Sequence, residues 1–169
     1  MTGPAPNPAT RWGRALVSEL VASGVTAACA TPGSRSTPLT LALVEHEDVT
    51  VYSHLDERSA AFFALGRSKR SGEPTALVCT SGTAAANYHP AVVEADRSRT
   101  PLVVCTADRP PELQDSGANQ TIDQDGLYGP AGGRTDAATA RPAATRSARR
   151  FRGPAPGSGR VRDQRTAEP

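Results

Sequence analysis

Short apolar runs alternate with longer segments of helical periodicity between residues 8 and 107, and this alternation is what most constrains the fold. Apolar residues recur at helical spacing in 8–24, whereas 25–30 is short and continuously apolar. Three further helical segments each lead into another apolar run, at 49–54, 75–79 and 101–107. Buried strands that are joined by helices predict an α/β fold, with a parallel sheet and helices on both of its faces.

Turn-forming residues mark the ends of the predicted helices. Gly24 and Gly72 follow helical segments and are expected to terminate them. Ser36 or Thr37 can cap the second helix. The fourth helix is expected to run without interruption over about 83–95.

The pattern predicts one domain at residues 8–129, preceded by a flexible start at 1–7. Residues 130–169 differ in kind, because they contain nine arginines against three acidic residues and only two large apolar side chains, Phe151 and Val161. Such a segment buries too little surface to offset the entropy of ordering, so we expect a disordered tail. A basic arm that binds nucleic acid is the alternative, but no motif of that kind accompanies the arginines.

Cysteine use and hydropathy favour the cytoplasm. Cys29, Cys79 and Cys105 are odd in number, far apart and embedded in apolar runs, which predicts buried reduced thiols and neither a disulfide nor a metal site. The N-terminal segment lacks the uninterrupted apolar core of a signal peptide. No stretch approaches the roughly 20 apolar residues of a membrane span, so none is expected.

Residues suited to ligand binding follow the apolar runs, and α/β sheets bind ligands beyond the carboxyl ends of their strands. Ser34 and Arg35 lie in a turn of small residues before a helix, where free N–H groups and a guanidinium attract carboxylates or phosphates. Gly82 lets the backbone approach a ligand, and Arg109 directly follows the last apolar run.

Each of these features also has a plain structural interpretation. The turn at Ser34 can be a capped turn with a solvated arginine, and Arg109 can form a salt bridge with Asp108 or Glu112. Glu57 can be a solvated acid in a first helical turn. In its functional interpretation, the Glu57 carboxylate faces an apolar ligand site and shares a proton with a ring nitrogen.

Five segments carry a family resemblance: 29–46 (CATPGSRSTPLTLALVEH), 53–66 (SHLDERSAAFFALG), 79–95 (CTSGTAAANYHPAVVEA), 106–113 (TADRPPEL) and 117–129 (GANQTIDQDGLYG). In this order the chain resembles the 2-succinyl-5-enolpyruvyl-6-hydroxy-3-cyclohexene-1-carboxylate synthase family, thiamine-diphosphate enzymes of menaquinone biosynthesis. The resemblance implies the family's N-terminal pyrimidine-binding domain, in truncated form, which is itself an α/β parallel sheet.

The resemblance implies a cofactor side of the site. Glu57 matches the glutamate that hydrogen-bonds N1′ of the aminopyrimidine of thiamine diphosphate, favours its imino tautomer and so counts as catalytic. Thr80, Ser81 and Gly82 match the loop along the aminopyrimidine. Gln120 matches a further active-site position, next to both cofactor and substrate.

The resemblance also implies a substrate side. The family decarboxylates 2-oxoglutarate and adds the resulting carbanion to isochorismate, a transferase reaction. Both substrates are carboxylates, and Ser34, Arg35 and Arg109 match positions that bind isochorismate, with Gln120 beside them.

The family pattern stops near residue 129. The family's Gly-Asp-Gly…Asn motif, which holds the diphosphate and Mg²⁺ in a separate C-terminal domain, is absent from this sequence. Two subunits build each site in the family, so the chain is expected to supply about half of a site and to show no synthase turnover alone. It can be a catalytically dead fragment, or a non-catalytic module that pairs with a separately encoded diphosphate-binding domain. The compositional change at residue 130 is typical of a frameshift; a genuinely short protein and a decayed gene product are the rival hypotheses.

Overall fold

The structure, a computed structural model, describes residues 7–132. Four parallel strands form one sheet: β1 (Ala27–Ala30), β2 (Thr50–Ser53), β3 (Thr75–Cys79) and β4 (Leu102–Thr106). Their order across the sheet is β2-β1-β3-β4. The expectations of a flexible start at 1–7 and of a disordered tail at 130–169 lie mostly outside the described residues. The described part of these two segments is Asn7, which caps α1, and residues 130–132, which belong to a 3₁₀ turn.

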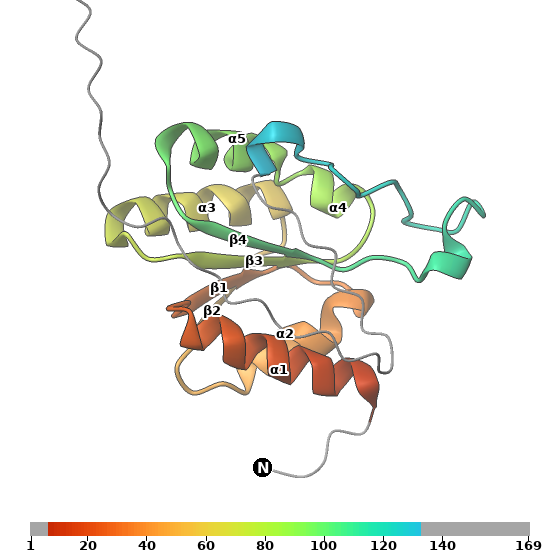
Figure 1. Cartoon of the computed structure of the whole chain (residues 1–169), viewed down its shortest axis with the longest axis horizontal. Coiled ribbons are helices and arrows are strands. Elements are labelled where there is room, and N and C mark those ends of the chain that lie inside the picture. The colour runs from red at the N-terminus through yellow and green to blue at the C-terminus, as the bar shows by residue number, and fades with distance from the viewer. Residues whose placement is uncertain (1–6, 133–169) are drawn as a thin grey trace, which may run out of the picture.

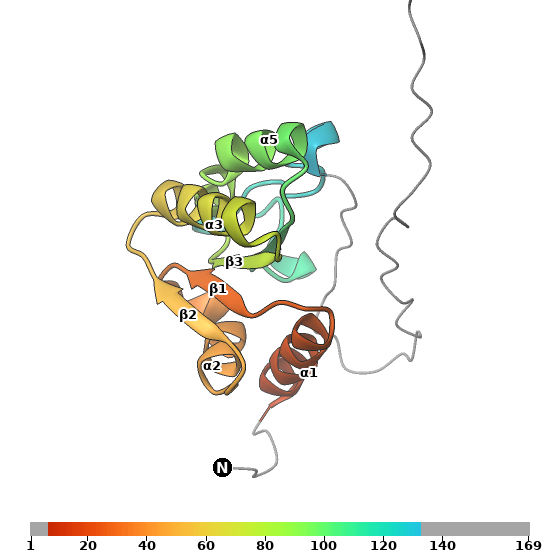
Figure 2. The same cartoon turned by 90° about the vertical axis from the view of Figure 1, so that its left-hand side faces the viewer.

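Helices cover both faces of this sheet (Figures 1 and 2). α1 (Pro8–Ala22) and α2 (Thr37–Val44) pack on one face, and α3 (Glu57–Ser71), α4 (Thr83–Ala86) and α5 (His89–Ser98) lie on the other. Short 3₁₀ turns η1 (Ser34–Ser36), η2 (Pro111–Leu113) and η3 (Gly129–Gly132) complete the described chain. The predicted α/β class, with a parallel sheet covered on both faces, is confirmed.

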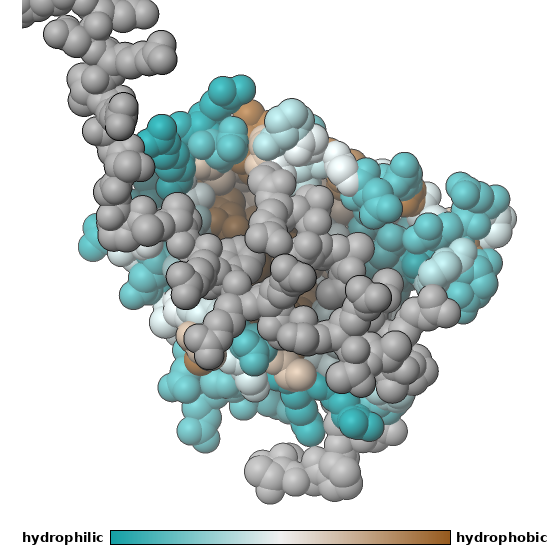
Figure 3. Space-filling view, viewed as in Figure 1, coloured by the Kyte–Doolittle hydropathy of each residue, from teal (hydrophilic) through white to brown (hydrophobic). Residues whose placement is uncertain are grey.

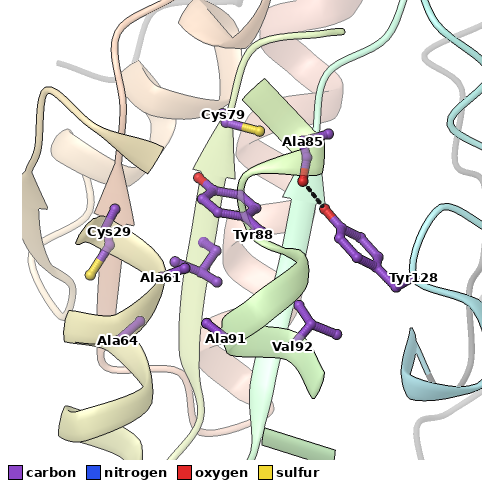
Figure 4. Close-up of a cluster of buried hydrophobic side chains, with 11 residues drawn as sticks. Cys29, Ala61, Ala64, Cys79, Ala85, Tyr88, Ala91, Val92 and Tyr128 are labelled. Atoms are coloured by element: carbon purple, nitrogen blue, oxygen red, sulfur yellow. Dashed lines mark hydrogen bonds between the residues drawn. The ribbon is translucent and has the colours of Figure 1, made fainter. Parts of the chain in front are cut away.

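Side chains along the central strands point alternately to the two faces of the sheet, and this divides the hydrophobic core into two clusters. On β3, Leu77 and Cys79 face α3 and α5, whereas Ala76 and Val78 face α1 and α2. Side chains of successive strand residues point to opposite faces, so a strand that is apolar throughout fills both clusters at once. In the first cluster, small alanines of α3 and α5 bring these helices close to the sheet around a fully buried Tyr88 (Figure 4).

Two glycines end helices as predicted. Gly24 follows α1 with φ +93°, and its amide donates to Val21 O at 2.9 Å. Gly72 follows α3 with φ +75°. Both adopt the left-handed conformation in which glycine carries no Cβ penalty.

The predicted side-chain cap of the second helix is wrong. The Ser36 and Thr37 hydroxyls donate backwards to Gly33 O, at 3.0 and 3.3 Å, and neither accepts a bond from the helix amides. The chain enters α2 through the 3₁₀ turn η1, so Ser36 is already helical in its backbone (φ −83°, ψ −7°). A capping residue needs an extended backbone to turn its oxygen toward those amides.

The uninterrupted helix predicted over 83–95 is also wrong, because α4 ends at Ala86 and α5 begins at His89. Pro90 has no N–H with which to bond the Ala86 carbonyl, and its ring would clash there. Proline is tolerated in a first turn, so the helix restarts with Pro90 within it.

The outer strands differ from the central ones. β2 is an edge strand that is largely exposed, whereas every residue of β3 is buried. Over the described part of the chain, hydrophilic side chains dominate the outer surface and apolar ones are visible toward the middle (Figure 3). Within residues 7–132, no helix combines the length and apolarity that crossing a bilayer requires.

Candidate functional site

The strand order creates a switch point between β1 and β3. β1 leads into α2 on one face of the sheet, and its neighbour β3 leads into α4 on the other. The two departing loops, 31–36 and 80–82, therefore separate at the carboxyl edge, which is the usual ligand position in open α/β sheets. Most of the site residues predicted from the sequence lie in these two loops.

Gly33 and Thr80 bring the two loops into contact. A Cβ atom added to Gly33 would lie 2.3 Å from Thr80 Cβ, so only glycine allows this approach. The Thr80 side chain is buried, and its Oγ1 has no hydrogen-bond partner among residues 7–132. A buried hydroxyl of this kind is available to a bound group.

Glu57 is the first residue of α3, next to the end of β2. Asp56 caps the helix, since its Oδ1 accepts a bond of 2.7 Å from the Ser59 amide. That hydrogen bond holds the pKa of Asp56 below its ordinary value of 3.8. Glu57 is half-buried, and its carboxylate makes no hydrogen bond or ion pair within the described chain.

The Glu57 carboxylate influences two buried groups, Cys79 at the end of β3 and Tyr88 before α5. Burial raises the pKa of Cys79 to about 12, and the nearby Glu57 carboxylate adds to the increase. Burial likewise raises the pKa of Tyr88, with a further contribution from Glu57. The Tyr88 hydroxyl, beside Cys79 in Figure 4, is buried and has no hydrogen-bond partner among the residues described. The Glu57 carboxylate therefore lies in reach of a dry region beyond β3.

Arg35 and Arg109 converge on one backbone oxygen. Arg109 Nε and Nη2 donate to Asn119 O at 3.1 and 2.6 Å, and Arg35 Nη2 donates to the same oxygen at 3.5 Å. Neither guanidinium forms an ion pair with any residue in 7–132. Two unneutralised cations at one neutral acceptor create a positive potential that suits an anion.

The salt bridge considered for Arg109 is not formed within the described chain. The Asp108 carboxylate instead accepts the Arg109 backbone amide at 2.7 Å and Gln114 Nε2 at 3.3 Å. The Arg109 guanidinium therefore stays directed at Asn119.

Gln120 joins Arg35 to the loop after β3. Its Oε1 accepts from Arg35 Nη1 at 2.8 Å, and its carbonyl accepts from Ser81 Oγ at 2.7 Å. A Cβ atom added to Gly82 would lie 3.0 Å from the Gln120 carbonyl carbon and oxygen. The approach of the Gly82 backbone to a ligand stays a prediction, whereas the structure shows this backbone, with φ +85°, against Gln120 of the same chain.

Ser34 lies apart from this network. It is exposed at the start of η1, and its hydroxyl makes no hydrogen bond with the described residues. A hollow of about 150 Å³ opens beside the same turn, lined by Thr31, Pro32, Gly33, Thr37, Thr40 and Leu41. Space for part of a ligand therefore exists on the α2 side of the turn.

Sequence reasoning missed two residues that organise the site. Asn119 contributes only its backbone carbonyl, which no side-chain pattern reveals. Gln124 joins three groups: its Oε1 accepts the Gly82 amide at 2.8 Å, and its Nε2 donates to Thr106 Oγ1 at 3.2 Å and Ala107 O at 3.1 Å. Both residues lie in 117–129, so that segment was the one available signal.

The described residues contain no group of three or more His, Cys, Asp or Glu side chains placed to hold a metal ion. Cys29 and Cys79 are free and buried, as predicted, and Cys105 is free and half-buried.

Comparison with known proteins agrees with this geometry. The family described as thiamine pyrophosphate enzyme, N-terminal TPP binding domain, matches residues 10–127. Proteins described as 2-succinyl-5-enolpyruvyl-6-hydroxy-3-cyclohexene-1-carboxylate synthase are similar over this region. The one from Haloarcula marismortui is 72% identical over 127 residues, which cover 75% of this chain and 22% of the relative. The one from Thermobifida fusca is 59% identical over 125 residues, covering 74% and 23%.

The chain therefore spans about a fifth of the length of the curated relatives it matches. The matched region contains the whole sheet and all of the loops described above. The chain belongs to the thiamine pyrophosphate enzyme N-terminal TPP binding domain family.

Proposed function

We propose that this chain provides the aminopyrimidine-binding half of a thiamine-diphosphate site, in a cytoplasmic synthase that decarboxylates 2-oxoglutarate and joins the product to isochorismate. Family membership supports the cofactor, and the names of the similar proteins support the reaction. The observation that carries the proposal is the position of Glu57, whose unpartnered carboxylate lies at the carboxyl edge of the sheet near buried Cys79 and Tyr88.

The residues present fit the aminopyrimidine. Thr80 offers a buried hydroxyl that lacks a partner among residues 7–132, and Glu57 offers an unpaired carboxylate. When bound, thiamine diphosphate supplies the carbanion chemistry of the reaction. Glu57, which the Asp56 cap holds at the start of α3, would share a proton with a ring nitrogen of the bound group.

Arg35 and Arg109 bind carboxylate groups of the substrates in this proposal. Their guanidinium groups meet at Asn119 O without a counter-charge from the described residues. A substrate carboxylate would form charge-assisted hydrogen bonds there, which are roughly twice as strong as neutral ones. The exposed Ser34 hydroxyl, on the turn that carries Arg35, contributes a neutral hydrogen bond.

The diphosphate and Mg²⁺ bind to a separate half of the site, on a second subunit or a separate domain. Exposed apolar side chains close to Glu57 in the sequence support a partner surface here, because Leu55 is 92% exposed and Phe62 and Phe63 are each 43% exposed. Exposed apolar side chains of this size next to a site favour a protein contact. The partner that fits is a diphosphate-binding domain, and a homodimer of the complete enzyme would bring one to each Glu57.

A second function is a non-catalytic or inactive half-site. The observation in its favour is that the matched residues 10–127 include the Glu57 side of the site. In this case the chain binds a pyrimidine or a partner domain without turnover of its own. Synthase assays of the purified chain, alone and with an added diphosphate-binding domain, separate these alternatives.

The direct test is binding of thiamine, which carries the aminopyrimidine ring but no diphosphate. Nuclear magnetic resonance titration of the ¹⁵N-labelled full chain reports both the affinity and the residues affected. We expect shifts at Thr80 and Gly82, and about tenfold weaker binding for Glu57→Gln, in line with the loss of one charged hydrogen bond. Glu94→Gln, exposed on α5, is the matched control and leaves the affinity unchanged. Equal affinity of Glu57→Gln and the unmodified chain would overturn the proposal.

A further inference from the structure

We propose that Gln124 is a positioning residue that couples carboxylate binding at Arg35 and Arg109 to the backbone conformation at Gly82. Its side chain bonds the Gly82 amide on one side, and on the other it bonds Thr106 at the end of β4 and the Ala107 carbonyl, two residues before Arg109. The inference rests on the proposed function and names how two parts of that site communicate.

The first step of the coupling concerns the neutral oxygens that bond the two arginines. Asn119 O accepts from both guanidinium groups, and Gln120 Oε1 accepts from Arg35. A carbonyl oxygen has two lone pairs, so the three arginine N–H donors and Thr121 Oγ1, which lies 3.4 Å away, exceed what Asn119 O can bond well. A carboxylate offers more acceptor sites and a charge, so it displaces these neutral oxygens from the guanidinium groups.

Displacement of the Asn119 and Gln120 oxygens from the arginines also affects the loop after β3, because the segment that begins at Asn119 is bonded to that loop. We name residues 119–128 the strap. Along it, Gln120 O accepts from Ser81, the Gln124 side chain holds Gly82, and the Tyr128 hydroxyl donates to Ala85 O at 2.8 Å. Gln120 also has a positive φ of 54°, which is uncommon for a residue other than glycine. A shift at residues 119–120 therefore pulls on the Gly82 turn.

The Gln124 side chain controls how far the Gly82 backbone follows that shift. Its Oε1 makes a direct bond to the Gly82 N–H, while its Nε2 fixes the same side chain to Thr106 and Ala107 in β4 and the loop after it. The backbone of Gly82, at φ +85° and ψ −144°, is set by this bond and by its contact with Gln120. Because Gly82 opens α4 in the loop proposed to bind the aminopyrimidine, its conformation affects that binding.

The test uses succinate, a dicarboxylate probe, and the ¹⁵N-labelled full chain. Succinate is expected to shift the Nε–Hε signals of Arg35 and Arg109 and, with the same saturation curve, the Gly82 amide signal. In Gln124→Ala the arginine signals still shift, while the succinate-induced shift at Gly82 falls to less than half. Gln114→Ala is the matched control, since Gln114 bonds Asp108 and Arg109 O but not Gly82, and it keeps the full shift.

A second variant guards against loss of folding. Gln124→Glu retains an acceptor for the Gly82 amide but loses the two Nε2 donor bonds, so we expect an intermediate response, with thermal unfolding as the check on folding. Arginine shifts without a Gly82 shift in the unmodified chain, or a full Gly82 shift in Gln124→Ala, overturn the coupling and leave the proposed anion site standing. Absence of arginine shifts overturns both the coupling and the proposed carboxylate binding, while thiamine binding remains a separate measurement.

Discussion

Gly33 lies directly against Thr80, so that a Cβ atom added to Gly33 would fall 2.3 Å from the Cβ atom of Thr80. The contact joins the loops after β1 and β3 at the point where the chain departs to opposite faces of the sheet. Gly33 has φ 172°, an extended value open to every residue. Its requirement for glycine is therefore one of space alone.

Gly33→Ala is expected to destabilise the chain by about 1–3 kcal/mol, the usual cost of forcing extra volume into a packed site. Urea unfolding measures the change. Gly66→Ala is the control, because Gly66 is exposed inside α3 with no heavy atom near its Cβ position. There, alanine is expected to stabilise by about 0.5–1 kcal/mol through its helix propensity. A loss of stability at Gly66, or none at Gly33, would contradict this account.

The two buried tyrosines respond differently to loss of their hydroxyls. Tyr128→Phe removes the bond to Ala85 O and is expected to cost about 1 kcal/mol of the free energy of unfolding. Tyr88→Phe removes a buried hydroxyl that has no partner within residues 7–132, so the free energy of unfolding stays the same or rises. Denaturant unfolding of the two variants side by side checks this, and a larger loss at Tyr88 than at Tyr128 is the contrary result.

Acid weakens the cap that holds Glu57 in place. The Ser59 amide lowers the pKa of Asp56, so Asp56 contributes stability that is present above its ordinary pKa of 3.8 and is lost as the pH falls through the lower folded value. Asp56→Asn still accepts the amide bond but does not titrate. The melting temperatures of the two proteins are expected to converge between about pH 5 and pH 2. A difference that stays constant over this range would contradict the assignment.

The buried thiols are expected to be unreactive in the folded chain. Burial raises the pKa of Cys29 to about 11 and of Cys79 to about 12, so very little thiolate exists near pH 8, and both side chains are shielded as well. A thiol reagent at pH 8 should modify these two cysteines slowly in buffer and rapidly in concentrated urea, with peptide mapping to assign each site. Rapid modification of Cys79 without denaturant would show that the core around Tyr88 is open.

The sequence by itself determined the elements and the family. Hydrophobic periodicity is a local property, and it predicted the strands and most helix ends, including the glycines after α1 and α3. It failed at Pro90 and at Ser36, where a missing N–H and an added 3₁₀ turn altered the local geometry. The motif segments sufficed to identify the family because they occur in order along the chain.

The tertiary structure decided which of these residues meet. Arg35 and Arg109 are 74 positions apart, and they converge only because the strand order β2-β1-β3-β4 places their loops at one edge of the sheet. Their shared acceptor is the backbone of Asn119, and Gln124 holds the backbone at Gly82. Backbone groups are the same at every residue, so such contacts leave no pattern in the side chains and exist only once the sheet has assembled.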